Sequence, residues 1–461
     1  MTASTSSTAS RDIANLLHPY THLRKHEAQG PLVIVRGSGV NVFDDNGKEY
    51  IEALAGLWCV SLGFSEERLT QAAARQMSIL PNYHEFAHKS HDVAIELAER
   101  LLSILPVKMS KVFFQNSGSE ANDTAMKMVW YYWNAEGKHR KKKIISRIRG
   151  YHGVTVATAG LTGLPDNHRD FDLPLPNIRH VECPHYYRYG RPGENEEAFA
   201  TRMAENLEAQ ILREDPETIG AFIAEPLQGA GGVIIPPRTY FEKIQPILKK
   251  YEILFIVDEV ITGFGRTGNM FGAETYKLEP DIITVAKALS SGYLPISATI
   301  VSEKMYQAFL SQSDKIGQFA HGYTYSGHPV AAAVAIETLK IYEERRIVDH
   351  VRAVMGAFQA NLQAFAEHSF VGEVRGVGLI GALEFVADRS TRVSFERKLG
   401  VGAMIAAAAQ REGLIVRALG DTIAFCPPLI ITEQQLGQVF ERFGRALSSV
   451  TPAIEDLAKA T

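Results

Sequence analysis

Two apolar runs in the middle of the chain each end at ionisable residues. The run 253–257 precedes Asp258 and Glu259, and the run 282–286 precedes Lys287. Charges at the ends of buried strands are costly unless a partner compensates them. A single ligand, pyridoxal phosphate, could pair with both, because an amine reacts with its aldehyde and a carboxylate keeps its ring nitrogen protonated. Asp258 and Lys287 are therefore the predicted catalytic residues.

A second segment has the features of a phosphate site. Ser117, with Glu120 three residues later, is typical of a capped helix start that follows a strand. The free amide groups and positive dipole end of a helix suit a phosphate, and Gly118 allows close approach. The hydroxyl groups of Ser117 and Ser119 could add donors. Taken alone, the segment is more simply interpreted as an ordinary capped helix.

Other residues at predicted strand ends could contact a flat ring. Tyr151 lies between glycines and could stack on it, although a half-buried core tyrosine is the simpler interpretation. Val260 lies two positions beyond Asp258 and could pack beneath the ring. Glu225 ends a buried run, where a backbone amide, an arginine or a cofactor hydroxyl could hold it.

Two other patterns are weaker. The run 263–268 spells G-x-G-x-x-G, but it does not directly open a helix and no acidic residue follows at the expected distance, so a dinucleotide site is not predicted. His84, His88 and His91 are spaced like a metal-binding helix face, but no carboxylate or cysteine completes the set. Cys183 and His185 are also interpreted as incidental. No metal site is predicted.

The elements around these residues alternate between apolar runs and helical patterns, as in a mostly parallel sheet. Strands are predicted at 112–115, 144–146, 221–224, 254–257, 282–285 and 297–301, and helices include 120–132 and 240–250. The first sixty residues contain β-like runs at 32–36 and 40–43, followed by a turn at 45–47. The character of the chain changes after about residue 340. Helical patterns at 331–344 and 348–366 lead there to strands at 371–375, 379–385, 414–419 and 422–425. The predicted class is α/β.

The domain prediction follows from these changes of pattern. Residues 1–59 form an N-terminal segment, 60–340 a large domain, and 341–461 a smaller α+β domain that also includes the first segment. Residues 1–10 are expected to form a disordered tail rather than a signal peptide. The basic run 138–143 is expected to be a solvated loop, since no wider basic stripe accompanies it.

Composition limits the class of partner and compartment. A net charge of −4 does not favour nucleic-acid or membrane-surface binding, and no apolar stretch is long enough to span a bilayer. Three scattered cysteines argue against a disulfide framework, so a reducing cytoplasm is the expected location.

Together, the motifs resemble those of the class III pyridoxal-phosphate aminotransferases. The resemblance rests on Ser117–Ser119, Tyr151–Gly153, Glu225, Asp258–Gly268 and Lys287, and extends from about residue 30 to 450. It implies a fold-type I architecture, in which a mostly parallel seven-stranded sheet carries the cofactor. It also implies a homodimer with active sites at the interface, with a tetramer left open.

The resemblance assigns roles to individual residues. Lys287 would bind the cofactor covalently and, once released, move the proton between carbon atoms, while Asp258 would pair with the ring nitrogen. Tyr151 and Val260 would enclose the ring, and Thr324 would reach the phosphate of the other subunit. The other expected cofactor contacts are Ser117, Gly118, Ser119, His152 and Glu225.

Within the family, the chain resembles the ω-amino acid or amine:pyruvate subgroup. Trp58 would line the substrate pocket, with Phe86 and Ala230 as further lining positions. Arg417 would bind a substrate carboxylate and move aside for an uncharged amine, because guanidinium groups bind carboxylates through two parallel hydrogen bonds. The alternative for Arg417 is a strand residue paired with a local acid.

Three other functions remain open. The first is a 2-oxoglutarate-linked aminotransferase for γ-aminobutyrate, ornithine or a diamine, which would need a second cationic clamp that the sequence does not visibly supply. The second is a related decarboxylase or aminomutase. The third is a non-catalytic regulator, against which the intact Lys287 and Asp258 argue.

Overall fold

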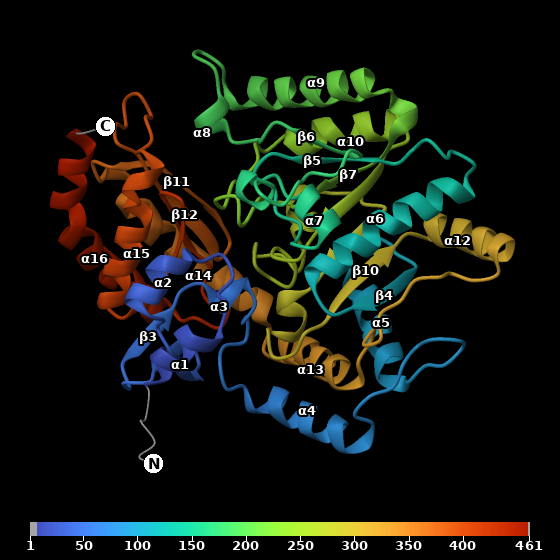
Figure 1. The fold of residues 1–461 in the computed structure, drawn as a ribbon, viewed down its shortest axis with the longest axis horizontal. Helices are drawn as coiled ribbons and strands as arrows, with labels where there is room; N and C mark the ends of the chain where they lie inside the picture. The colour runs from blue at the N-terminus through green and yellow to red at the C-terminus, as the bar shows by residue number, and fades with distance from the viewer. Residues whose placement is uncertain (1–6, 460–461) are drawn as a thin grey trace.

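The computed structural model describes residues 7–459, which fold into a larger and a smaller lobe (Figure 1). The larger lobe is built on a seven-stranded sheet between residues 111 and 301, and the smaller lobe on two four-stranded sheets. In one of these, β3 (Glu49–Glu52) pairs in parallel with β13 (Leu414–Ile415), so the two ends of the chain share a sheet. The predicted α/β class, with a smaller α+β part built from both ends, is confirmed. The domain boundaries at 59/60 and 340/341 stay predictions.

The large sheet places the ends of the two key strands side by side. Its order is β4 (Lys111–Gln115), β10 (Ser297–Val301), β9 (Ile282–Val285), β8 (Leu254–Asp258), β7 (Ile219–Ala224), β5 (Lys143–Arg147) and β6 (Ile178–Val181). Only β10 runs antiparallel to its neighbours. Because β8 and β9 are adjacent and parallel, their carboxyl ends meet at one edge of the sheet. Six of the strands were predicted; β6 was not, because Ile178-Arg-His-Val181 is short and half polar.

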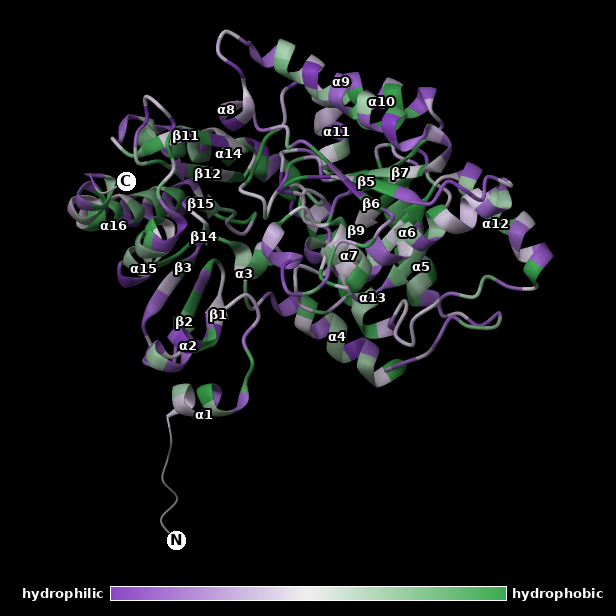
Figure 2. Cartoon of the chain, turned by 45° about the horizontal axis from the view of Figure 1, so that its top comes forward, coloured by the Kyte–Doolittle hydropathy of each residue, from purple (hydrophilic) through white to green (hydrophobic). Residues whose placement is uncertain are grey.

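Helices cover both faces of this sheet. They are α4 (Glu67–Ile79), α5 (Asp92–Ile104), α6 (Gly118–Ala135), α7 (Val156–Leu161), α8 (Tyr186–Tyr189), α9 (Glu196–Glu214), α10 (Tyr240–Lys250), α11 (Gly272–Tyr276), α12 (Glu303–Ile316) and α13 (Pro329–Glu344). Strand β7 is buried along its whole length, as a strand covered on both faces should be. Figure 2 shows hydrophobic strands at the centre and mixed colours on outer helices such as α9. No helix among residues 7–459 has the length and apolar character needed to cross a bilayer.

The smaller lobe joins segments from both ends of the chain. One sheet has the order β1 (Ile34–Ser38), β2 (Asn41–Asp44), β3 and β13, and the other β11 (Val371–Val377), β12 (Ile380–Phe385), β15 (Thr422–Phe425) and β14 (Arg417–Leu419). Its helices are α1 (Thr8–Asn15), α2 (Leu23–Gln29), the distorted turn α3 (Ala55–Trp58), α14 (Ile347–Gln363), α15 (Val401–Arg411) and α16 (Glu433–Lys459). The single strand predicted at 414–419 is divided at Val416, because its two halves pair in different sheets.

The prediction of a disordered tail over residues 1–10 is wrong for residues 8–10. These residues begin α1, and the Ser7 side chain caps the helix by accepting a hydrogen bond from the Ser10 amide. Residues 1–6 of that predicted tail lie outside the described residues. The Ser/Thr-rich composition that suggested disorder thus includes a helix-capping residue.

The prediction of a solvated loop over residues 138–143 is also partly wrong. Lys141 is fully buried, and its ammonium donates hydrogen bonds to four backbone carbonyls, from Pro216, Ile219, Tyr251 and Glu252, at 2.9–3.3 Å. Lys143 forms an ion pair with Glu214 at 2.8 Å. Carbonyl groups from loops far away in sequence compensate the buried charge, and a local charge pattern cannot reveal them.

Candidate active site

A cavity of about 860 Å³ opens at the carboxyl edge of β8 and β9. Every predicted site residue except Phe86 and Thr324 lines it. These residues are Trp58, Ser117, Gly118, Ser119, Tyr151, His152, Glu225, Ala230, Asp258, Val260, Lys287 and Arg417. They come from both lobes, so the fold gathers them across more than 350 positions of sequence.

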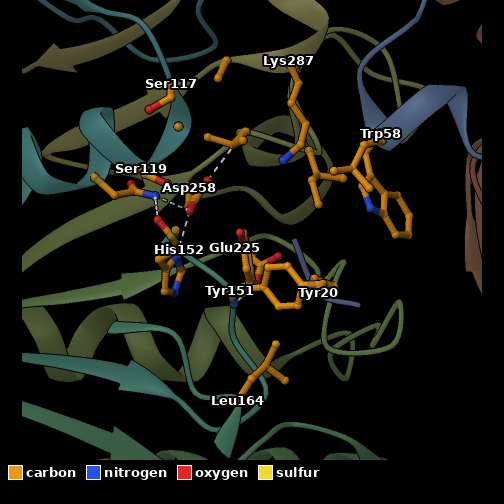
Figure 3. A pocket seen from close by; sticks show the side chains of 18 of the residues that line it. Tyr20, Trp58, Ser117, Ser119, Tyr151, His152, Leu164, Glu225, Asp258 and Lys287 are labelled. Carbon is orange, nitrogen blue, oxygen red and sulfur yellow. Dashed lines mark hydrogen bonds and ion pairs between the residues drawn. The ribbon is translucent and has the colours of Figure 1, made fainter. Parts of the chain in front are cut away.

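Asp258 is the buried carboxylate at the base of this cavity. Its Oδ2 accepts a hydrogen bond from Asn122 Nδ2 at 2.7 Å and lies 2.8 Å from His152 Nδ1, while its Oδ1 accepts one from the Val260 amide at 3.1 Å. Asn122 is itself fixed, because its amide oxygen accepts from the hydroxyl of Thr284 on β9 at 2.9 Å. The carboxylate is therefore held in one orientation toward the cavity (Figure 3).

Lys287 extends into the same cavity from the turn that follows β9 (Figure 3). Its backbone is in the left-handed region, with φ of 46°, at the start of a 3-10 turn over Lys287–Ser290. Helix α13 packs on this turn. Burial lowers the pKa of Lys287, an effect that the nearby Asp258 carboxylate partly opposes. The lysine thus has a larger neutral fraction than an exposed one, as a nucleophilic amine requires.

The amino end of α6 forms another wall of the cavity. Ser117 caps the helix, with its Oγ accepting from the Glu120 amide at 3.2 Å, whereas the Glu120 carboxylate accepts from Asn116 at 2.7 Å. The amide groups of Gly118 and Ser119 have no acceptor among residues 7–459. A Cβ at Gly118 would lie 3.0 Å from Val260, so the close packing of helix and loop requires glycine. Two free amides at a helix start form a site for a phosphate.

The remaining cofactor candidates form the sides of the cavity. Tyr151 is half-buried, and burial, with a contribution from the Tyr20 hydroxyl, raises its pKa. The carboxylate of Glu225 accepts hydrogen bonds from the amides of Tyr151 at 3.0 Å and Gly229 at 2.9 Å. Of the partners considered for Glu225, the structure thus shows backbone amides. Its burial raises its pKa.

Arg417 begins β14 and brings a positive charge into the cavity from the smaller lobe. Its guanidinium makes no hydrogen bond or ion pair within residues 7–459, so the predicted alternative, a strand arginine paired with a local acid, does not hold. Burial lowers its pKa, and Tyr151 and Tyr20 oppose that shift. An arginine in this position offers its donors to a ligand.

The two exceptions, Phe86 and Thr324, are exposed and lie on two loops that pack against each other. A Cβ on Gly322 would lie 2.7 Å from the Phe86 ring, and one on Gly327 would overlap the Glu85 carboxylate. The loops around residues 85 and 324 therefore form one surface, outside the cavity of their own chain.

Three further residues of the cavity that bear on the site were not predicted from the sequence. Asn122 orients Asp258 from one turn inside α6, where no local pattern marks it. Tyr20 reaches the cavity from the N-terminal segment, and its hydroxyl accepts a hydrogen bond from Asn167 at 2.5 Å. Arg149 lines the cavity with left-handed backbone, φ 65°, two positions before Tyr151. The only signal of Arg149 in the sequence is the glycine that follows it, Gly150.

The residues present fit pyridoxal phosphate. The free amides of α6 match its phosphate, Asp258 matches a protonated ring nitrogen, and Lys287 matches its aldehyde. The distinguishing feature is the combination, in one cavity, of an anion site, a fixed carboxylate and an amine of lowered pKa. If Asp258 and Lys287 formed only a structural ion pair, free amide groups at the start of α6 would not be needed.

Comparison with known proteins gives the same family from sequence and structure. The family model described as Aminotransferase class-III matches residues 23–447. Gamma aminobutyrate transaminase 1, mitochondrial, of Solanum lycopersicum is 50% identical over 96% of this chain and 86% of its own length. The omega transaminase from Pseudomonas jessenii, solved in complex with PMP, is 56% identical, with a TM-score of 0.96 over 97% of this chain and 99% of that one. A thermostable omega transaminase with the substitutions W58M, F86L and R417L, engineered for the synthesis of bulky amines, is also 56% identical, with a TM-score of 0.96 over 97% of this chain and 100% of that one.

The first prediction concerns the amine. Lys287→Ala should reduce turnover by at least about 10³-fold, because proton transfer by a positioned group alone contributes roughly 10²–10⁴-fold. Initial rates with an amine donor, and retention of cofactor after borohydride treatment, measure the effect. The exposed Lys315→Ala is the matched control and should behave like the wild type. Normal turnover by Lys287→Ala would refute the assignment.

The second prediction concerns the residue that positions Asp258. Asn122→Ala removes a hydrogen bond to a buried carboxylate and should cost on the order of 2 kcal/mol of unfolding free energy. It should also loosen cofactor binding, which equilibrium dialysis against pyridoxal phosphate measures. Asn361→Ala removes an amide that bonds only within its own helix, to Ala357 O, and serves as the control. Equal cofactor affinity in both variants would contradict the positioning role.

Proposed function

The chain belongs to the class III aminotransferases, and we propose that it transfers an amino group from an amine or ω-amino acid to pyruvate. The two half-reactions share one cavity, as in a ping-pong mechanism. In one half-reaction the cavity must accept a small keto acid, and in the other a larger donor that need not carry a carboxylate.

The unpaired Arg417 is the observation that supports this proposal most. A half-buried guanidinium without an acid is costly, so its presence is best explained by an anionic ligand. Pyruvate has one carboxylate, which one guanidinium can bind through two hydrogen bonds. Since the position lies on β14 of the smaller lobe, the carboxylate would be held opposite Lys287.

The other side of the substrate region is apolar. Leu57, Trp58, Leu164, Ile261 and Leu419 all line the cavity. Such a wall suits the hydrocarbon part of an amine. This chain also has Trp, Phe and Arg at the positions 58, 86 and 417 that were changed in the engineered omega transaminase, which supports their assignment to the substrate region.

Lys287 and Asp258 divide the chemistry between them. When bound, pyridoxal phosphate supplies an electron-withdrawing ring that stabilises negative charge at the carbon beside the amino group. Asp258 presents a fixed carboxylate that keeps a proton on the ring nitrogen. The amine of Lys287, which has a lowered pKa, can accept a proton at Nζ and return it within the cavity.

The alternative acceptor is 2-oxoglutarate, and two observations favour testing it. One of the relatives is named a gamma aminobutyrate transaminase. Arg149 and Arg397 also line the cavity, so the structure contains candidates for the second clamp that the sequence did not reveal. Arg397 is paired with Asp166, and the tip of Arg149 lies near Gly232 and Arg375. Arg417 is thus the arginine best placed for a keto acid.

We also propose that the protein is a homodimer whose partner completes each active site. Phe86 and Tyr325 are 46% and 57% exposed although both are large and apolar. They lie on the surface formed by the loops around residues 85 and 324, which carries both predicted site residues that the cavity of the same chain lacks. A two-fold axis would deliver Phe86 and Thr324 to the partner's cavity.

The third prediction tests the role of Arg417. Arg417→Ala should lower kcat/KM for pyruvate by roughly 30- to 150-fold, because a bidentate contact to a charged group is worth about 2–3 kcal/mol. Use of benzaldehyde, a neutral acceptor, should change little. A matrix of amine donors against pyruvate, 2-oxoglutarate and benzaldehyde measures this, with the exposed Arg213→Ala as control. Equal loss for all acceptors would contradict carboxylate binding, and a preference for 2-oxoglutarate abolished by Arg149→Ala would favour the alternative.

The fourth prediction tests the shared site by subunit mixing. Lys287→Ala and Thr324→Asp should each be nearly inactive, since the latter places a negative charge beside the partner's phosphate. Mixed dimers of the two contain one site with neither defect, so mixing should restore about a quarter of wild-type activity. Mixing Lys287→Ala with Asp258→Ala should restore none, because both defects lie in the cavity of the chain that carries them. No gain in the first mixture would argue against a site that spans two subunits.

A further inference from the structure

Three ionisable side chains converge near the N-terminus, in a segment that the proposed reaction does not use directly. Asp12 lies on α1, His26 on α2, and His18 in the connection between them. His18 Nε2 lies 2.8 Å from Asp12 Oδ1, and His26 Nε2 lies 3.0 Å from the same oxygen. The two imidazole rings pack against each other at an interplanar angle of 35°, with centroids 4.0 Å apart. Two ring nitrogens therefore converge on one carboxylate oxygen, and the three candidate ligand atoms all lie within 4.8 Å of one another.

The spacing is close to what a tetrahedral metal ion requires. Zinc binds imidazole nitrogen and carboxylate oxygen at about 2.0–2.2 Å, which places neighbouring ligand atoms about 3.3 Å apart. The two nitrogen–oxygen separations, 2.8 and 3.0 Å, need to lengthen by only a few tenths of an ångström, and the two nitrogens lie within 4.8 Å of each other. A metal ion would replace the protons that now lie between the histidines and the carboxylate. Three protein ligands leave a fourth position for water.

The cluster is both accessible and held in place. The side chains of His18, His26 and Asp12 are 28%, 10% and 15% exposed, so an ion can reach them from solvent.

The second metal-compatible group among residues 7–459, His185 with Glu373 and Glu384, is different. There, Arg375 Nη1 lies 2.5 Å from both carboxylates and already supplies the cation.

We propose that Asp12, His18 and His26 bind a divalent transition metal ion of the zinc class, which fastens the N-terminal segment over the active-site cavity. Pro19 and Tyr20 lie between the two histidines in sequence, and both line the cavity. The Tyr20 side chain lies beside Tyr151 in Figure 3. The ligands come from two helices and their connection, so the ion would cross-link the turn that presents Tyr20. The metal is structural and takes no part in amino transfer.

No metal site is predicted from the sequence, although the folded chain brings these three residues together. The intervals of six and eight residues between Asp12, His18 and His26 match no short metal motif. The three residues come together only through the arrangement of α1, α2 and their connection. The histidines at 84, 88 and 91, which are spaced like one face of a helix, do not form a metal-compatible group in the described chain.

The fifth prediction is a metal-binding measurement on the cofactor-loaded full chain. After treatment with a chelator, the wild type is dialysed against Zn²⁺ alone and bound zinc is determined. We expect about one equivalent per chain that Asp12→Asn and His26→Ala lose, with affinity falling by more than about 10-fold. His22→Asn is the matched control, since His22 lies on the same segment outside the cluster and asparagine preserves its capping role at α2.

A second readout tests the fastening and does not depend on amino transfer. Zn²⁺ should slow trypsin cleavage at Arg24 and Lys25 at least several-fold in the wild type and in His22→Asn, but not in Asp12→Asn. Equal zinc binding by all four proteins would mean that surface histidines bind the ion adventitiously, and would overturn the site. Zinc binding that depends on the cluster but gives no protection from trypsin would overturn the proposal that the ion fastens the N-terminal segment. Either failure would leave the proposed transaminase function unaffected.

Discussion

A buried carboxylate and a buried amine at the ends of two adjacent parallel strands are the constraint around which this molecule is organised. Neither Asp258 nor Lys287 is stable in such a place without partners. Asn122 and His152 therefore converge on Asp258, and α13 supports the turn that carries Lys287. The same edge of the sheet receives the free amides of α6. The chemistry of the site thus follows from the way the fold compensates for its own buried charges.

The backbone around the cavity is held in conformations that are uncommon for residues other than glycine. Trp58, Arg149 and Lys287 all have left-handed φ values between 46° and 65°. Each such residue costs on the order of 1 kcal/mol and persists only where its surroundings impose it. Here the surroundings include β-sheet ends, α13 and, for the turn before Trp58, the buried Glu52 carboxylate, which accepts a hydrogen bond from the Leu54 amide at 2.8 Å. The site is therefore built to keep its side chains in place before a ligand arrives.

The parts of this site that the sequence predicts are those that depend on local order. Asp258 and Lys287 could be found because each directly follows an apolar run, and Gly118 because it begins a capped helix. Asn122 could not, since its partner Asp258 is 136 positions away and a buried asparagine has no local signature. Lys141 looked like a surface residue because the carbonyls that surround it belong to distant loops. The resemblance to the family assigned site roles to Phe86 and Thr324. Neither residue lines the cavity of its own chain, so these roles would require a second subunit.

The division of one predicted strand into β13 and β14 has a further consequence for how substrates are held. Arg417 belongs to a sheet of the smaller lobe, whereas Lys287 and Asp258 belong to the sheet of the larger one. Arg266 links the two through hydrogen bonds to the carbonyls of Leu379 and Pro427. A rotation of one lobe against the other would move the arginine relative to the amine without disturbing the ring-binding groups. If Arg417 binds the substrate carboxylate as proposed, the angle between the lobes sets the distance from that carboxylate to Lys287, and hence the length of acid that the site accepts.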